Sequence, residues 1–198
     1  MSKSLTSQDF ERAAKRMAVS VAHIRAVNEV ESNGNGFLPD GRVKVQYEPH
    51  IMHRRLRAKF GEVFADKMLA QFPDLVAIKA GSYQSADKED RDMDRAVKLI
   101  DRDCALESAS WGAYQIMGYH WKVCGFVRLQ DFVNAMQTAG GQLDVFVRFV
   151  LADSRLWRAL REKDWRTFAE IYNGSNYKAF NYDVKIAAAY KRYEKLLG

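Results

Sequence analysis

The sequence predicts an α+β fold that is predominantly α-helical and contains one small β-hairpin. Apolar residues recur with helical spacing along most of the chain, and most clearly in its C-terminal third. An alternation of polar and apolar residues occurs in residues 42–47, directly after the turn signal Pro39-Asp40-Gly41. The length of 198 residues and the hydrophobic content of 47% fit a packed domain. We therefore predict that residues 1–198 form a single domain.

The charge and the cysteine content limit the binding partners and the cellular compartment that we expect for the protein. The net charge of +6 favours anionic partners, although, taken alone, it is better explained by a lysine-rich surface. No basic block or nucleic-acid motif occurs, so we expect no nucleic-acid partner. The N-terminus lacks the apolar segment of a secretion signal, and no apolar run is long enough to span a membrane. Cys104 and Cys124 form no disulfide framework; we expect free thiols, with one bridge left open.

The second of two predicted N-terminal helices ends at a glutamate, Glu31. Ser7 is predicted to cap a first helix, and Ser20 a second helix that starts at residue 21. On a helical wheel this second helix has one apolar stripe, which comprises Val21, Ile24, Val27 and Glu31. Glu29 points to the opposite side and follows Arg25 by one turn, as in an exposed ion pair. We therefore expect Glu31 on the buried face and Glu29 on the surface.

The predicted position of Glu31 has a chemical consequence. Burial and the negative end of the helix dipole both disfavour the charged form of its carboxyl group. A glutamate that keeps its proton near neutral pH is suited to act as a general acid. The alternative interpretation is a solvated glutamate at a frayed helix end, without a chemical role.

A second carboxylate follows on the predicted hairpin. Residues Asn33 to Asn35 favour turns, and Asp40 lies at the tip of the hairpin that follows them. Inverting cleavage of a glycosidic bond needs a general acid and a general base on opposite faces of the sugar. Folding of the hairpin over Glu31 would make Asp40 that base. The alternative is an ordinary turn aspartate that binds its own backbone.

The remaining elements are predicted to be helices, apart from a loop over residues 74–88. Glu48-Pro49 opens the next helix, because proline suits the first helical position. The apolar segment 145–151 predicts the central core helix. The other predicted helices cover residues 64–71, 87–102, 113–117, 129–138, 142–152, 154–161, 164–172 and 182–197.

Two groups of side chains in the sequence are candidate metal ligands. His50 and His53 lie one turn apart near Glu48, and His120 lies near Cys124. Neither group has the spacing of a zinc site. We therefore predict neither a metal site nor a cofactor.

Three short motifs in one order resemble those of the lysozyme-like superfamily, which includes goose-type lysozymes and soluble lytic transglycosylases. They are Glu31-Ser32, the segment 110–118 (SWGAYQIMG) and the segment 169–174 (AEIYNG). Gly36-Phe37, Asp40 and Tyr47-Glu48-Pro49-His50 further resemble the N-acetylmuramidase family of phage endolysins. Two features depart from these patterns: the last motif lacks a residue before its glycine, and residues 53–59 lack a threonine that could hold a water.

The resemblance implies a lysozyme-like fold and a role for each motif. Glu31 would protonate the leaving oxygen, and Asp40 would activate water. The residues implied to contact the substrate are Ser32, Ser110, Trp111, Gln115, Asn173 and Tyr177. Tyr114 and Tyr119 are further candidates for stacking on sugar rings. For Trp111 and Tyr114, packing in the core is an equally good interpretation.

The function implied by the resemblance is cleavage of the β-1,4 bond between N-acetylmuramic acid and N-acetylglucosamine in peptidoglycan. The protein would be a monomeric endolysin without a separate cell-wall-binding domain. It would be made in the host cytoplasm and reach the wall after a holin opens the membrane. Two alternatives stay open: a lytic transglycosylase, which uses one glutamate and no water, and a non-catalytic binder of peptidoglycan or nucleic acid.

Overall fold

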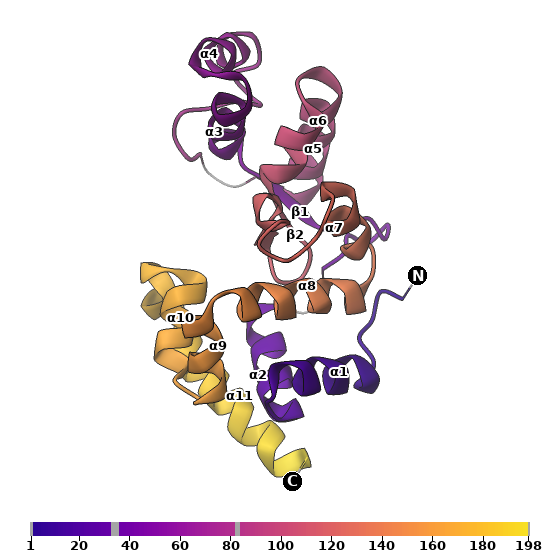
Figure 1. The fold of residues 1–198 in the computed structure, drawn as a ribbon, viewed down its shortest axis with the longest axis vertical. Coiled ribbons are helices and arrows are strands. Elements are labelled where there is room, and N and C mark those ends of the chain that lie inside the picture. Colours follow the sequence, from indigo (N-terminus) through magenta and orange to yellow (C-terminus); the bar gives the residue numbers. More distant parts are fainter. Residues whose placement is uncertain (1, 33–35, 82–83, 198) are drawn as a thin grey trace.

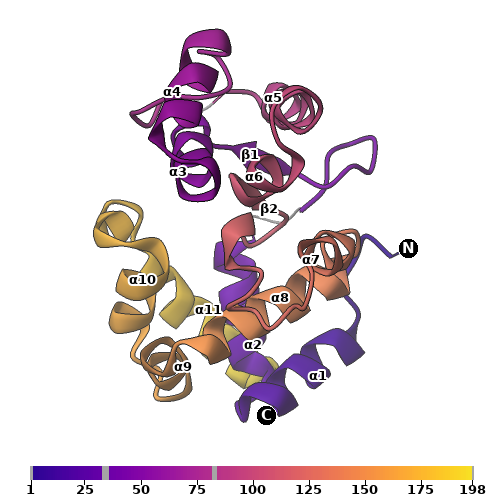
Figure 2. The ribbon, with the colours of Figure 1, turned by 45° about the horizontal axis from the view of Figure 1, so that its top comes forward.

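The structure is a computed structural model and describes residues 2–32, 36–81 and 84–197. It consists of two lobes joined by a small sheet (Figures 1 and 2). Helices α3 to α6 form one lobe, and the remaining long helices form the other. The turn predicted at Asn33 to Asn35 lies outside the described residues.

The first helix, α1 (Ser7–Met17), starts one residue earlier than predicted, whereas the second, α2 (Val21–Glu31), starts and ends at the predicted residues, with Ser20 at its N-cap position but without a capping side-chain hydrogen bond. The predicted cap at Ser7 was wrong by one residue. Thr6 caps α1, because its side chain accepts a hydrogen bond from the Asp9 N–H while the Asp9 carboxylate accepts one from the Thr6 N–H. The predicted apolar face of α1 is buried and comprises Phe10, Ala13, Ala14 and Met17.

The upper lobe in Figure 1 contains α3 (Pro49–Phe60), α4 (Glu62–Gln71), α5 (Ala86–Leu99) and α6 (Arg102–Glu107). Pro49 is the first residue of α3, as predicted. The helix predicted over residues 87–102 ends earlier than expected. Asp101 starts a new helix there, because its carboxylate accepts a hydrogen bond from the Cys104 N–H at 2.8 Å.

The sheet has three antiparallel strands in the order β1 (Val45–Tyr47), β2 (Ala109–Trp111) and β3 (Ile116–Met117). The predicted hairpin around Asp40 also forms, as a bridge between Phe37 and Val43. The helix predicted over residues 113–117 was wrong. Gly112 and Gln115 have φ values of 69° and 49°, in the left-handed region, so the chain turns back as a second hairpin.

The lower lobe contains η1 (Gly118–His120), α7 (Leu129–Ala135), α8 (Ala139–Ala152), α9 (Ser154–Arg161), α10 (Trp165–Asn173), η2 (Ser175–Phe180) and α11 (Tyr182–Leu197). The predicted core helix is α8, which crosses the centre of the molecule in Figure 1. Its buried residues include Val145, Phe146, Val147 and Val150. Helix α11 packs along α2, the helix that ends at Glu31.

One buried glutamine connects α8 to both hairpins, and we call this contact the Gln142 clasp. The Gln142 side chain accepts a hydrogen bond from the Ala113 N–H at 2.8 Å and donates to the carbonyl oxygens of Gly36 and Met136 at 3.3 and 2.9 Å. A Cβ atom at Gly36 or Gly112 would lie 1.9 or 2.6 Å from this side chain. The two glycines therefore leave the space that the glutamine fills.

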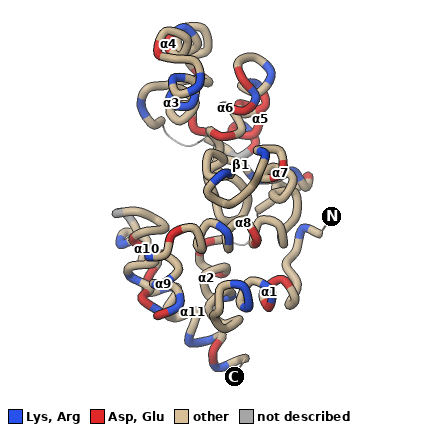
Figure 3. The backbone as a smooth tube through the Cα atoms, viewed as in Figure 1, with Lys and Arg blue, Asp and Glu red and all other residues tan. Residues whose placement is uncertain are grey.

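Charged residues are spread over both lobes, and both cysteines are buried. Basic and acidic residues occur on both lobes (Figure 3). None of the helices in the described part is long and apolar enough to cross a membrane. Cys104 and Cys124 are both buried and free, and burial raises the pKa of their thiols to about 12 and about 11.

Candidate active site

Glu31 is the last residue of α2 and is partly buried, as its place on the apolar stripe predicts. Its Oε1 accepts a hydrogen bond of 3.0 Å from the Nδ2 of Asn173, the last residue of α10. Burial raises the pKa of Glu31 from 4.5 to about 7, although the Asn173 hydrogen bond acts in the opposite direction. A substantial fraction of Glu31 therefore carries a proton at neutral pH, and this proton is available for transfer.

Glu29 lies on the other side of α2 and is exposed, also as predicted. Its predicted partner was wrong: Glu29 pairs with Arg192 of α11. The Arg25 guanidinium instead lies 4.4 Å from the ring centre of Phe10. Glu29 thus connects two helices on the surface, and it provides a matched control for Glu31.

Glu31 opens into a cavity of about 520 Å³ between several elements. Its walls come from the turn before β3, η1, α8, α10 and the first residue of α11. Polar or aromatic side chains at the wall include Gln115, Tyr119, His120, Asn173 and Tyr182. Among the residues that line it, Glu31 is the one carboxylate. This combination of aromatic rings, amides and one protonated carboxyl group is suited to binding and cleaving a sugar chain.

Two tyrosine hydroxyl groups form hydrogen bonds that connect the helices around Glu31. The Tyr172 hydroxyl of α10 donates to the Tyr114 carbonyl oxygen at 2.9 Å. The Tyr114 hydroxyl in turn donates to Asn28 Oδ1 of α2 at 2.6 Å. Tyr114 is 4% exposed and stacks on Phe146, as expected of a core residue, and it also lines the Glu31 cavity. These bonds fix α2, the turn and α10 relative to one another, and hence the position of Glu31.

The predicted substrate-binding residues divide into two groups. Gln115 and Asn173 line the cavity with Glu31, and Ser110 is connected to it because its hydroxyl donates to Gln115 Oε1 at 2.7 Å. Trp111 is 3% exposed, and its indole N–H donates to the Leu106 carbonyl oxygen, so it packs in the core. Tyr177 is 2% exposed and does not line this cavity.

Ser32 lies next to Glu31 in the sequence but faces another cavity. That cavity is also lined by Asn28, Glu29, Phe37 and Gln142. Glu31 is not among its lining residues, although Tyr114 lines both cavities. A direct contact between Ser32 and a sugar bound beside Glu31 is therefore not supported by its position.

Asp40 is likewise not among the residues that line the Glu31 cavity. Its side chain is 51% exposed at the hairpin tip, and one carboxylate oxygen accepts a hydrogen bond from Arg42 Nε at 2.7 Å. Arg42 also pairs with Asp87 and Asp90 of α5, which anchors the hairpin to the upper lobe. Hydrogen bonds from the Arg42 backbone and guanidinium lower the pKa of Asp40. Asp40 remains charged, but the structure does not bring it to Glu31.

Two cavity residues, His120 and Tyr182, were missed as candidates for substrate contact. His120 packs edge-on against Phe149, and burial lowers its pKa. Burial and the nearby Glu31 carboxylate raise the pKa of Tyr182, which begins α11. In the sequence, the place of His120 near Cys124 suggests only a metal ligand. The position of Tyr182 next to a helix start carried no signal, because its proximity to Glu31 depends on how α11 packs.

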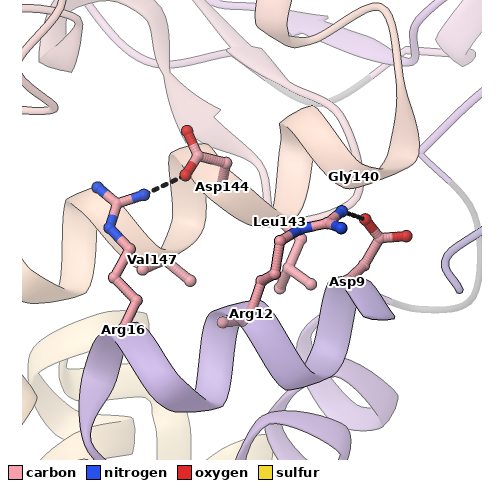
Figure 4. A pocket seen from close by; sticks show the side chains of 8 residues that line it. Asp9, Arg12, Arg16, Gly140, Leu143, Asp144 and Val147 are labelled. Atoms are coloured by element: carbon pink, nitrogen blue, oxygen red, sulfur yellow. Dashed lines mark hydrogen bonds and ion pairs between the residues drawn. The ribbon is translucent and has the colours of Figure 1, made fainter. Parts of the chain in front are cut away.

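A further cavity, of about 170 Å³ and separate from those at Glu31 and Ser32, lies between α1 and α8 (Figure 4). Leu143 and Val147 form its apolar wall. Its charged groups are already paired, Arg12 with Asp9 and Arg16 with Asp144. The cavity shares no lining residue with the one at Glu31, and it has no free group that could perform chemistry. Within the described part of the chain, no cluster of three or more potential metal-ligating side chains occurs.

A family model and a solved structure match this chain. Residues 20–194 match the N-acetylmuramidase family. The crystal structure of the Burkholderia AP3 phage endolysin is 47% identical in sequence, with a TM-score of 0.91; the match covers 98% of this chain and 73% of the endolysin chain. No curated protein sequence matches. The family match includes Glu31, Gln115 and Asn173, and the chain therefore belongs to the N-acetylmuramidase family.

Proposed function

We propose that this muramidase hydrolyses the β-1,4 bond between N-acetylmuramic acid and N-acetylglucosamine with Glu31 as the general acid. The observation that carries the proposal is the raised pKa of Glu31, about 7, inside the cavity that Gln115 and Asn173 also line. The proton of Glu31 moves to the glycosidic oxygen as the bond to the muramic acid C1 breaks. Asn173 orients the Glu31 carboxyl group, and the cavity side chains bind the sugars.

The experiment compares three proteins on purified cell walls: the wild type, Glu31→Gln and the matched control Glu29→Gln. Glutamine keeps the shape of Glu31 but has no proton to donate, so we expect Glu31→Gln to lose ~10²–10⁴-fold in rate. Glu29→Gln should stay within about threefold, because its ion pair with Arg192 is exposed. Equal losses in the two variants, measured by wall turbidity with circular dichroism as a folding check, would refute the role of Glu31.

A lytic transglycosylase is the second candidate, because Glu31 is the one carboxylate that lines its cavity. Mass spectrometry of the digest separates the two reactions. Hydrolysis leaves a muramic acid with a free reducing end, whereas transglycosylation leaves a 1,6-anhydro sugar that is lighter by one water. We expect the hydrated product, and anhydro product from the wild type would replace hydrolysis by transglycosylation.

The biological role that we propose is lysis of a bacterial host by a phage endolysin. The support is the 47% identity to the Burkholderia AP3 phage endolysin over 98% of this chain. The net charge of +6 favours adsorption to an anionic wall. In this role the protein accumulates in the host cytoplasm and reaches the peptidoglycan after a holin opens the membrane.

A further inference from the structure

Most polar groups in the cavity beside Glu31 are already bonded within the protein. The Asn173 amide donates to Glu31, and the Gln115 amide is bonded within its own turn. The hydroxyl groups of Tyr114 and Tyr172 also donate to protein atoms. These bonds hold the four side chains in place and leave them little capacity for further hydrogen bonds.

His120 differs from these residues, because its ring is held in place while its nitrogens are free. The imidazole packs against Tyr119 and Phe149, with ring centres 4.3 and 5.0 Å away. Among the residues that the structure describes, neither ring nitrogen has a hydrogen-bond partner. Neither nitrogen is sealed from solvent either, in contrast to the unpartnered Nε2 of the buried His23. Both nitrogens of His120 are therefore available to a ligand in the cavity.

The His120 imidazole is neutral at pH 7 and lies at some distance from the Glu31 carboxylate. Burial lowers the pKa of His120 below its usual value, and the charge of Glu31 does not contribute to this shift. The same charge adds to burial in raising the pKa of Tyr172 and Tyr182. His120 is therefore further from Glu31 than these two tyrosines are. A neutral imidazole offers one N–H donor and one acceptor.

The cavity wall suits a neutral group of the glycan better than a carboxylate. Its apolar residues include Met117, Phe149 and Ile171, and no lysine or arginine is among the described residues that line it. The lactyl carboxylate of muramic acid would lose hydration here without gaining a counter-charge. An acetamido group fits, because its methyl group packs on apolar side chains while its carbonyl oxygen accepts a hydrogen bond from an imidazole N–H.

We propose that His120 determines the specificity of this enzyme for the 2-acetamido group of an N-acetylated sugar. Its N–H donates to the acetamide oxygen, and Phe149 and Met117 contact the methyl group. The proposal rests on the proposed muramidase function, because the same glycan places its scissile bond at Glu31. Removal of the acetyl group leaves an ammonium group, which cannot accept the hydrogen bond and brings a charge to an apolar wall.

The test measures binding in the Glu31→Gln background, in which the ligand is not consumed. The ligands are a peptide-free tetrasaccharide of alternating N-acetylglucosamine and N-acetylmuramic acid, and its de-N-acetylated counterpart. His120→Phe keeps a ring but loses the N–H, so we expect calorimetry to show about tenfold weaker binding of the acetylated ligand. His120→Asn keeps an N–H donor and should stay within about threefold. For the de-N-acetylated ligand, His120→Phe should make no further difference, and circular dichroism should be unchanged throughout.

Nuclear magnetic resonance separates a contact with the sugar from a structural role. The chain has four histidines, and comparison with His120→Asn identifies the ring signals of His120. The acetylated ligand should shift these signals and leave those of His53, which contacts Asp66 outside the cavity, in place. Unmoved His120 signals in the bound protein would overturn the proposal. Unchanged affinity of His120→Phe, or an equal loss for both ligands, would do so as well. Absence of glycan binding with His120 intact, or an active Glu31→Gln, would instead overturn the proposed function itself.

Discussion

At the scale of single residues, Glu31 shows a conflict between catalysis and stability. A carboxyl group with a pKa raised from 4.5 to about 7 binds its proton more tightly in the folded protein than in the unfolded chain. The folded state therefore loses stability as the pH rises from about 4.5 to about 7. The loss above this window is about 3 kcal/mol, from the free energy that corresponds to the two pKa values.

This conflict predicts the stability of Glu31→Gln. Glutamine has no charged form, so the variant should unfold at about the same temperature as the wild type at pH 4. At pH 8 we expect it to be more stable by about 3 kcal/mol, because the wild type then contains a buried carboxylate. Thermal unfolding followed by circular dichroism at both pH values measures the difference. Wild-type stability equal to that of the variant at pH 8 would show that Glu31 is solvated.

The residue scale also shows what sequence alone could predict at the site. Glu31 and Glu29 were placed correctly because their faces depend on the local period of one helix. Asp40 could not be placed, because its position is fixed by Arg42 pairing with Asp87 and Asp90 more than 40 residues away. The sequence shows which residues are charged, but it does not show which of them form ion pairs.

At the scale of elements, α2 depends on α11 more than on any other helix. Ile186 and Tyr190 of α11 are buried, and the Tyr190 ring packs edge-on against His23 of α2. At the other end of α11, Leu196 and Leu197 are exposed. Helix α11 is thus docked along its first part and reaches solvent at its end.

This packing predicts the effect of removing α11. Deletion of residues 182–198 would expose the buried side of α2 and remove Tyr182 from the Glu31 cavity. We expect the truncated protein to be unfolded, as judged by circular dichroism and protease sensitivity. A control that removes residues 196–198 alone should fold and keep its activity, since Leu196 and Leu197 are exposed. A folded, wall-active protein without residues 182–198 would contradict this account.

The wrongly predicted helix at residues 113–117 has an instructive cause. Its residues have ordinary helical propensity, but Gly112 and Gln115 adopt left-handed backbone conformations. The Gln115 side chain stabilises this turn by donating to the Gly112 carbonyl oxygen at 2.7 Å. The Ala113 N–H binds Gln142, which lies 29 residues further along. Local propensity therefore lost to a contact between distant elements.

At the scale of the whole molecule, the order of helices was predictable because each has its own apolar stripe and boundary signals. The assembly of two lobes around a sheet was not, since β1 and β2 come from segments more than 60 residues apart. Ser110 illustrates the difference. Its residue type was visible in the sequence, but its place opposite Gln46 became clear from the register of β1 with β2.

The proposed lysis role makes a prediction about the intact cell. We expect cells that express the protein in the cytoplasm to keep growing, and to lyse within minutes when a holin gene is induced as well. Cultures that express the holin with Glu31→Gln provide the control, and their optical density should fall more slowly. Rapid lysis by the wild-type protein without a holin would require another route across the membrane.

The Gln142 clasp has a consequence for the mutational landscape of this enzyme. Positions 36, 112 and 142 share one small volume, but the Gln142 side chain is not the only obstacle to a larger residue at either glycine. A Cβ atom at Gly36 would also lie 2.5 Å from the Ala113 nitrogen, and Gly112 has a φ of 69°. A smaller residue at 142 removes the hydrogen bond of the Ala113 N–H and the hydrogen bonds that Gln142 donates to the Gly36 and Met136 carbonyl oxygens, although the Lys44 N–H still binds the Gly36 oxygen. Single-site libraries will therefore find all three positions intolerant. Shortening Gln142 relieves neither glycine, so libraries that vary the three positions together should recover both glycines as well.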